Sequence, residues 1–182
     1  MSKQMHIGGV TIGGGAAVTI QSMCSTPTED VAATVAQILR LEQAGCQIVR
    51  VAVPTMEAAQ AIGQIRRAIH IPLVADIHFD YRLALECVRQ GVDKIRINPG
   101  NIGSQERVRA VADACRDHGI PIRIGVNGGS LEKPLLEKYG GVTAQALVDS
   151  AMGHVRLLQD CFFDNICISV KCSHVPTNMQ AY

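Results

Sequence analysis

Short apolar segments rich in Val and Ile alternate along the chain with longer segments of helical periodicity. Strands are predicted, in chain order, at Val18–Met23, Ile48–Val53, Leu73–Ile77, Lys94–Asn98, Ile122–Val126 and Asn165–Lys171. Helices are predicted between them at Glu29–Ala44, Met56–Ala68, Tyr81–Gln90, Ser104–His118 and Thr143–Asp160. Strands that are apolar along most of their length are typical of a parallel sheet whose two faces are both covered.

A unit made of a helix, a glycine and an arginine within an apolar strand recurs along the sequence. It is found at Gly45/Arg50, Gly91/Arg96 and Gly119/Arg123. Consecutive βα units of this size predict an α/β fold, either a doubly wound sheet or a TIM-type (β/α)8 barrel. The glycine-rich segment Ile7–Ile20 predicts an N-terminal β-hairpin that runs into the first strand.

Composition limits the class of protein. Hydrophobic residues make up 47% and charged residues 18% of the chain, which is typical of a globular domain. No apolar run is long enough to cross a bilayer and no secretory signal is visible, so we expect a cytoplasmic protein without a membrane partner. A net charge of +1 and 3% aromatic residues do not favour nucleic-acid binding. Seven scattered cysteines without a CxxC motif favour free thiols.

Polar side chains interrupt the predicted strands, and strand residues two apart lie on the same face of a sheet. The residues concerned are Arg50, Asp76, His78, Arg96, Asn98, Arg123, Asn127, Ser169 and Lys171. Three arginines and one lysine face a single aspartate, and an unpaired buried charge is costly. We therefore expect these strands to form a cationic site for a phosphate or diphosphate at their carboxyl ends. The alternative is a set of separate structural ion pairs.

Asp76 and His78 are the best candidates for proton transfer, because His titrates near neutral pH and a carboxylate on the same face can orient it. A metal site is the alternative, although two ligands alone do not make one. The glycine-rich segments that follow Asn98 and Asn127 allow backbone N–H groups to approach an anion. Cys161, Cys167 and Cys172 straddle a predicted strand and are expected to be core thiols.

Six segments, in this order, are similar to the 4-hydroxy-3-methylbut-2-enyl diphosphate synthase family: IGGGAAVTIQSM, VRVAVP, LVADIHFD, KIRINPGNIG, PIRIGVNGGSLE and ISVKCS. The resemblance covers essentially the whole chain and implies a TIM-type (β/α)8 barrel. It implies the reductive ring opening and dehydroxylation of 2-C-methyl-D-erythritol 2,4-cyclodiphosphate in isoprenoid biosynthesis. It also implies a [4Fe–4S] cluster, flavodoxin or ferredoxin as the electron donor, and a homodimer.

The resemblance assigns roles to the same polar residues. It implies that Arg50, Arg96, Arg123 and Lys171 contact the diphosphate, that Asn98, Asn127 and Ser169 are neutral donors around it, and that Asp76 and His78 line the same mouth.

Chains of this family are longer and hold the cluster with three Cys and one Glu in a C-terminal domain. No segment here matches that domain, so no cysteine of this chain is assigned as a metal ligand. We therefore expect residues 1–182 to be an N-terminal barrel domain, truncated after about six of the eight βα units. The alternatives are a barrel transferase similar to dihydropteroate synthase and a non-catalytic anion-binding barrel fragment.

Overall fold

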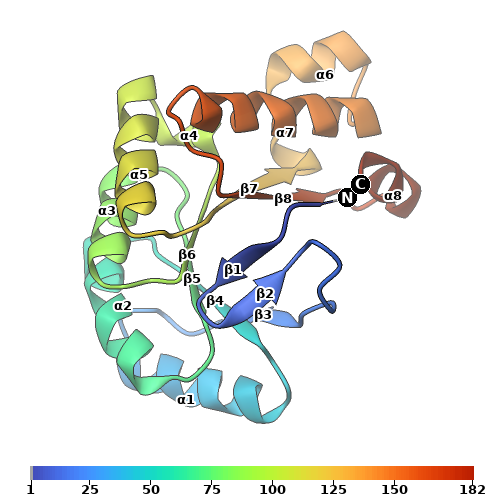
Figure 1. Ribbon diagram of the computed structural model, residues 1–182. Coiled ribbons are helices and arrows are strands. Elements are labelled where there is room, and N and C mark those ends of the chain that lie inside the picture. The colour runs from blue at the N-terminus through green and yellow to red at the C-terminus, as the bar shows by residue number, and fades with distance from the viewer. Residues whose placement is uncertain (1) are drawn as a thin grey trace.

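The computed structural model describes residues 2–182 and contains a curled sheet of parallel strands (Figure 1). The strands are β3 (Gln21–Met23), β4 (Ile48–Ala52), β5 (Leu73–Asp76), β6 (Lys94–Ile97), β7 (Ile122–Asn127) and β8 (Ile166–Lys171). They lie side by side in sequence order, and every neighbouring pair is parallel. This arrangement confirms the predicted barrel architecture, with six strands forming a partial (β/α)8 barrel.

Helices cover the outer, convex face of the sheet (Figure 1). They are α1 (Val31–Gln43), α2 (Met56–Ala68), α3 (Tyr81–Arg89), α5 (Gln105–Asp117) and α7 (Ala144–Gln159). Every second strand residue points outward into this core, where Val49, Ile95 and Ile122 are fully buried. The residues between them point to the concave inner face, so the outer face of the sheet is apolar and the charged strand side chains lie on the inner face.

The N-terminal hairpin covers the start of the inner face. Strands β1 (Met5–Ile7) and β2 (Val10–Ile12) pair antiparallel, and Gly8 in the turn has a positive φ of 52°. Ile7 packs in a small cluster with Ile48 and Val74, which are inner-face residues of β4 and β5. The hairpin therefore closes the sheet at the end where the parallel strands begin.

Two predicted boundaries in this region are wrong. The hairpin spans Met5–Ile12 and does not extend to Ile20, and the first parallel strand begins at Gln21 instead of Val18. The carbonyl of Ile20 still accepts hydrogen bonds from the N–H groups of Gln47 and Ile48, but residues 18 and 19 have no register partner among the described strands, and the side chain of Val18 is 96% exposed. An apolar run without a pairing partner does not form a strand.

The connections contain short helices that the apolar pattern did not predict. These are α4 (Pro99–Ile102), a 3-10 turn (Gly128–Ser130), α6 (Lys133–Tyr139) and α8 (Val175–Ala181). The 3-10 turn and α6 lie between β7 and α7, in a segment for which neither a strand nor a helix was predicted. Among residues 2–182, no helix combines the length and the apolar character needed to span a membrane.

Candidate anion-binding site

The inner face carries a row of charged side chains across four neighbouring strands. Asp76 of β5 is in register with Arg96 of β6, Arg96 with Arg123 of β7, and Arg123 with Cys167 of β8. Arg50 of β4 lies on the same face, two residues before the register partner of Asp76. Strand alternation thus brings together side chains that are far apart in sequence, as predicted from their spacing.

Asp76 is the centre of the charge network. Its carboxylate is almost completely buried, and its Oδ1 accepts a hydrogen bond of 2.9 Å from Nη1 of Arg96. Its Oδ2 lies 3.6 Å from Nε of Arg50, whose guanidinium also contacts Sδ of Met23. Both arginines thus pair with the same carboxylate. The alternative of structural ion pairs therefore accounts for part of their charge, because one negative charge is shared by two positive ones.

Arg123 has no carboxylate partner among the described residues. Its Nε donates a 2.8 Å hydrogen bond to the neutral hydroxyl of Ser169. Burial lowers the pKa of Arg123, and the positive charges of Arg50 and Arg96 lower it further, whereas Cys167 and Tyr182 act in the opposite direction. A negatively charged ligand would compensate this excess of positive charge.

His78 lies at the mouth, above Asp76, and its side chain is 55% exposed. The distance between its Nε2 and Oδ2 of Asp76 is 3.7 Å, which is longer than a hydrogen bond. Lys171 is exposed at the end of β8. The ring of His78 is therefore free to turn toward a ligand, while Asp76 is held by the arginines.

The two predicted asparagines already use their side-chain oxygens. Oδ1 of Asn98 accepts from the N–H of Gly100, and Oδ1 of Asn127 accepts from the N–H of Gly129, both at 3.1 Å. These bonds cap the short helices that follow β6 and β7. The amide N–H groups of the two side chains remain as the donors for a ligand, which is consistent with a role as neutral donors.

Two residues of the inner face were missed by the sequence analysis. A Cβ on Gly125 would lie 2.5 Å from Nε of Arg96, so glycine at this position leaves the room that the guanidinium occupies. Lys94 lies on the inner face two residues before Arg96 and is 2% exposed. The sequence could have indicated that Lys94 belongs to the inner face, because strand alternation places its side chain on the same face as that of Arg96, two residues away.

The described cysteines do not form a metal centre. Five of the seven are buried, and burial raises the pKa of Cys87 and Cys115 to about 12, which keeps them as thiols. No group of three or more His, Cys, Asp or Glu side chains within residues 2–182 could hold a metal ion. The residues that the structure describes do not fit a [4Fe–4S] cluster.

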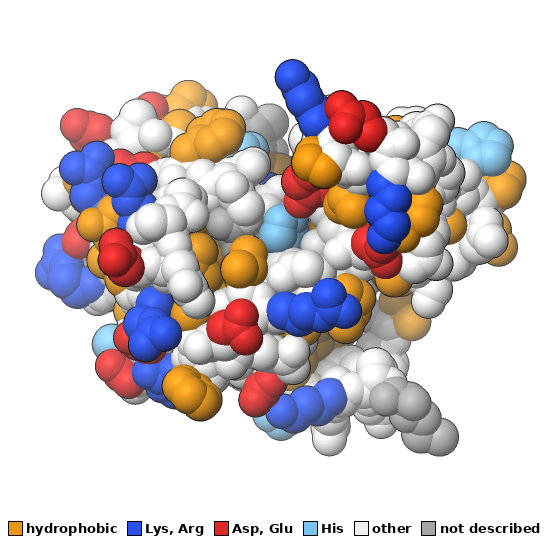
Figure 2. All heavy atoms as spheres, turned by 90° about the horizontal axis from the view of Figure 1, so that it is seen from above, with side chains coloured by type: hydrophobic (Ala, Val, Ile, Leu, Met, Phe, Trp, Pro, Cys, Tyr) orange, Lys and Arg blue, Asp and Glu red, His pale blue; other side chains and the backbone are white. Residues whose placement is uncertain are grey.

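Charged side chains of both signs are interspersed over the face of the molecule in Figure 2. On the inner face of the sheet, by contrast, Arg50, Arg96, Arg123 and Lys94 surround the one carboxylate found there in the described chain, that of Asp76. The fold and this face together define a parallel α/β barrel with a cationic interior, a class whose ligands bind at the carboxyl ends of the strands.

The chain belongs to the family described as the GcpE TIM-barrel domain, which matches residues 2–182. It is 59% identical over 181 residues to the 4-hydroxy-3-methylbut-2-en-1-yl diphosphate synthase (flavodoxin) of Lysinibacillus sphaericus, covering 100% of this chain and 49% of the relative. It is 56% identical over 181 residues to the protein of the same name from Ruminiclostridium cellulolyticum, covering 100% of this chain and 51% of that relative. These matches confirm the resemblance. The chain spans about half the length of the curated relatives.

Solved structures with a similar fold have little sequence in common with the chain. Yersinia pestis dihydropteroate synthase superposes with a TM-score of 0.68 at 13% identity, over 98% of this chain and 70% of that one. A type I 3-dehydroquinate dehydratase from Clostridium difficile gives a TM-score of 0.63 at 14% identity, over 93% of this chain and 81% of that one. These similarities show the barrel fold alone.

Proposed function

We propose that this chain is the substrate-binding barrel of an enzyme that converts 2-C-methyl-D-erythritol 2,4-cyclodiphosphate to 4-hydroxy-3-methylbut-2-enyl diphosphate. The observation that carries the proposal is the inner-face network, in which one carboxylate faces several cations. The high identity to relatives that carry the synthase name supports this function over that of a dihydropteroate synthase. It also supports an enzyme over a non-catalytic anion-binding fragment.

In this proposal the side chains of the chain bind and orient the substrate. Arg50, Arg96, Arg123 and Lys171 hold the diphosphate oxygens, and the amide groups of Asn98 and Asn127 and the hydroxyl of Ser169 donate to the remaining ones. Asp76 fixes Arg96 and Arg50 before the substrate arrives, so less ordering is required on binding. His78 is the group placed to move a proton at the mouth, because its ring is exposed there and its Nε2 lies 3.7 Å from the carboxylate of Asp76.

The electrons for the reduction require a redox group outside the described residues of this chain. We propose a [4Fe–4S] cluster bound by another domain of the full-length protein, with flavodoxin or ferredoxin as the donor. Flavodoxin is the donor that the names of the relatives contain. We further propose a cytoplasmic homodimer.

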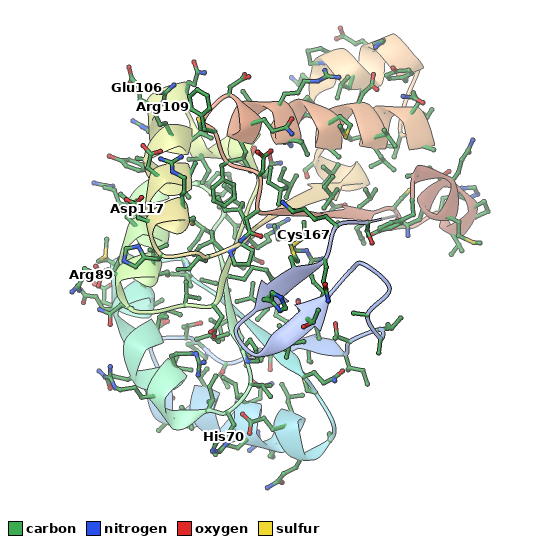
Figure 3. All side chains as sticks on the ribbon, viewed as in Figure 1. His70, Arg89, Glu106, Arg109, Asp117 and Cys167 are labelled. Atoms are coloured by element: carbon green, nitrogen blue, oxygen red, sulfur yellow. The ribbon has the colours of Figure 1, made fainter. Side chains whose placement is uncertain are left out.

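The experiment is titration calorimetry of the cyclodiphosphate into the full-length protein and into its Arg96→Ala and Arg123→Ala variants. Each substitution removes charge-assisted hydrogen bonds that contribute about 1.5–3 kcal/mol, so affinity should fall by about tenfold or more. Arg109→Ala is the matched control, because Arg109 is exposed on the outer helix α5 (Figure 3).

Anaerobic turnover with reduced flavodoxin should fall in parallel with affinity in the inner-face variants and stay unchanged in the control. Wild-type affinity in both inner-face variants would contradict the assignment of the site. Absence of cyclodiphosphate binding to the wild-type protein would contradict the proposed function itself.

A further inference from the structure

A cavity of about 370 Å³ lies between the inner face of the sheet and the N-terminal hairpin. Ile7 and Ile12 of the hairpin form one wall, and Lys94, Arg123 and Ser169 contribute polar groups to the opposite wall. Figure 3 shows Cys167, another lining residue, on β8 with its side chain toward the hairpin. The volume is within the range of small-ligand pockets, about 300–1,000 Å³.

Lys94 points into this cavity and has no counter-ion in the described part of the chain. The residue is 2% exposed, and no carboxylate of residues 2–182 lies within ion-pair distance of its amine. The neighbouring Asp93 is engaged elsewhere, because it pairs with Arg66 at 2.6 Å and accepts from the N–H of Leu73 at 2.8 Å. Asp76 is already shared by two arginines.

The surroundings of Lys94 oppose its positive charge. Burial lowers the pKa of Lys94, and the positive charges of Arg123 and Arg50 lower it further, while Cys167 acts in the opposite direction. Arg123, which is partly buried on the same cavity wall, also has no carboxylate partner among the described residues. Two cations and no carboxylate line the cavity among the described residues. Two neighbouring cations without a carboxylate destabilise the ligand-free protein. An anion bound between them would offset this loss of folding free energy.

We propose that Lys94 is a further anion-binding residue, which holds the innermost phosphoryl group of a diphosphate together with Arg123. The inference rests on the proposed function and extends its site from the mouth to the floor of the inner face. A lysine amine suits this position because it is a compact charge with three donors that can turn toward whichever oxygens reach it. Arg96, two residues further along β6 than Lys94, and Lys171 at the end of β8 then hold the outer phosphoryl group.

The test is titration calorimetry of pyrophosphate and of orthophosphate into the full-length wild-type protein and its Lys94→Met variant. Pyrophosphate should bind about tenfold or more weakly to the variant, because a charge-assisted contact is lost. The affinity for orthophosphate should decrease less, since a single phosphoryl group can bind to the arginines nearer the mouth. Lys94→Arg keeps the charge but replaces the compact amine with a larger planar group, so it should lose less affinity than Lys94→Met.

A second readout separates ligand binding from a structural role. Because Lys94 is buried without a counter-ion, Lys94→Met should raise the melting temperature of the ligand-free protein and reduce the further rise that pyrophosphate causes. Lys3→Met, which removes an exposed lysine, is the control and should change neither quantity. Lys94→Gln is the second neutral variant in case the methionine variant does not fold.

Equal pyrophosphate affinity in wild type and Lys94→Met would overturn the inference while leaving the proposed function in place. Equal losses for both anions would overturn the assignment to the innermost group. A lower melting temperature in the ligand-free methionine variant, or failure of both neutral variants to fold, would make Lys94 structural. A wild-type protein that binds neither pyrophosphate nor the cyclodiphosphate would contradict the proposed function as well.

Discussion

The substitution Asp76→Asn tests whether one carboxylate holds the inner-face arginines in place. Asparagine keeps the shape of the side chain and removes its charge. In the wild-type structure Asp76 pairs with Arg96 at 2.9 Å and with Arg50 at 3.6 Å. The variant therefore leaves two guanidinium groups, together with Arg123 and Lys94, without any carboxylate on the inner face of the described chain.

The expected loss of stability follows from the burial of these groups. Breaking a buried ion pair by removing one partner costs about 3–5 kcal/mol, because the other charge stays buried. The side chain of Asp76 is 5% exposed, but those of Arg96 and Arg50 are 19% and 25% exposed, so water compensates part of the loss. We expect a net destabilisation of about 2–4 kcal/mol, which corresponds to roughly 5–12 °C in melting temperature.

The assay is thermal unfolding of the full-length protein followed by circular dichroism, with and without pyrophosphate. Because the variant has one more uncompensated positive charge, pyrophosphate should raise its melting temperature more than that of the wild type. Asp117→Asn on the exposed face of α5 is the matched control and should melt as the wild type does (Figure 3). A melting temperature of Asp76→Asn within about 2 °C of the wild type would refute the reasoning.

Two further predictions concern the walls and the loops of the site. Gly125→Ala places a methyl group where the guanidinium of Arg96 lies, so we expect a folded protein with about tenfold weaker pyrophosphate binding by calorimetry; unchanged affinity would contradict this role of Gly125. His154 contacts Glu132 at 3.0 Å, and burial lowers the pKa of His154 despite the opposing charge of Glu132. As the pH falls below about 6.5, the unfolded chain therefore binds more protons than the folded chain. The free energy of unfolding should decrease over the same pH range. The loss of unfolding free energy between about pH 7 and pH 5, measured by denaturant unfolding, should be smaller in His154→Gln than in the wild type. The exposed control His118→Gln should show the same loss as the wild type. Equal losses in the two variants would contradict the prediction.

The sequence pattern predicted the order and type of the main elements because parallel strands buried on both faces and capped helices have strong local signals. The glycines after three predicted helices have positive φ values, which end these helices: 91° at Gly45, 83° at Gly91 and 67° at Gly119. The first parallel strand was predicted too long, because pairing partners, and not apolar character, decide where a strand begins. The short helices after β6 and β7 depend on asparagine caps, which hydrophobic periodicity does not detect.

The inner-face residues were predictable because alternation fixes which side chains share a face. The ion-pair partners of these residues were not predictable, since the contact between Asp76 and Arg50 depends on how neighbouring strands are staggered. The space that Gly125 provides for Arg96 also depends on this stagger. The roles of Asp76, His78 and the other candidate residues in substrate binding remain predictions.

The most direct test of the account is a crystal structure of the full-length protein with the cyclodiphosphate bound. We expect the phosphoryl oxygens to lie within hydrogen-bond distance of Arg96, Arg123 and Lys171, on the concave face of the sheet, with the Asp76–Arg96 pair intact. A diphosphate bound away from this face, with these side chains unliganded, would contradict it.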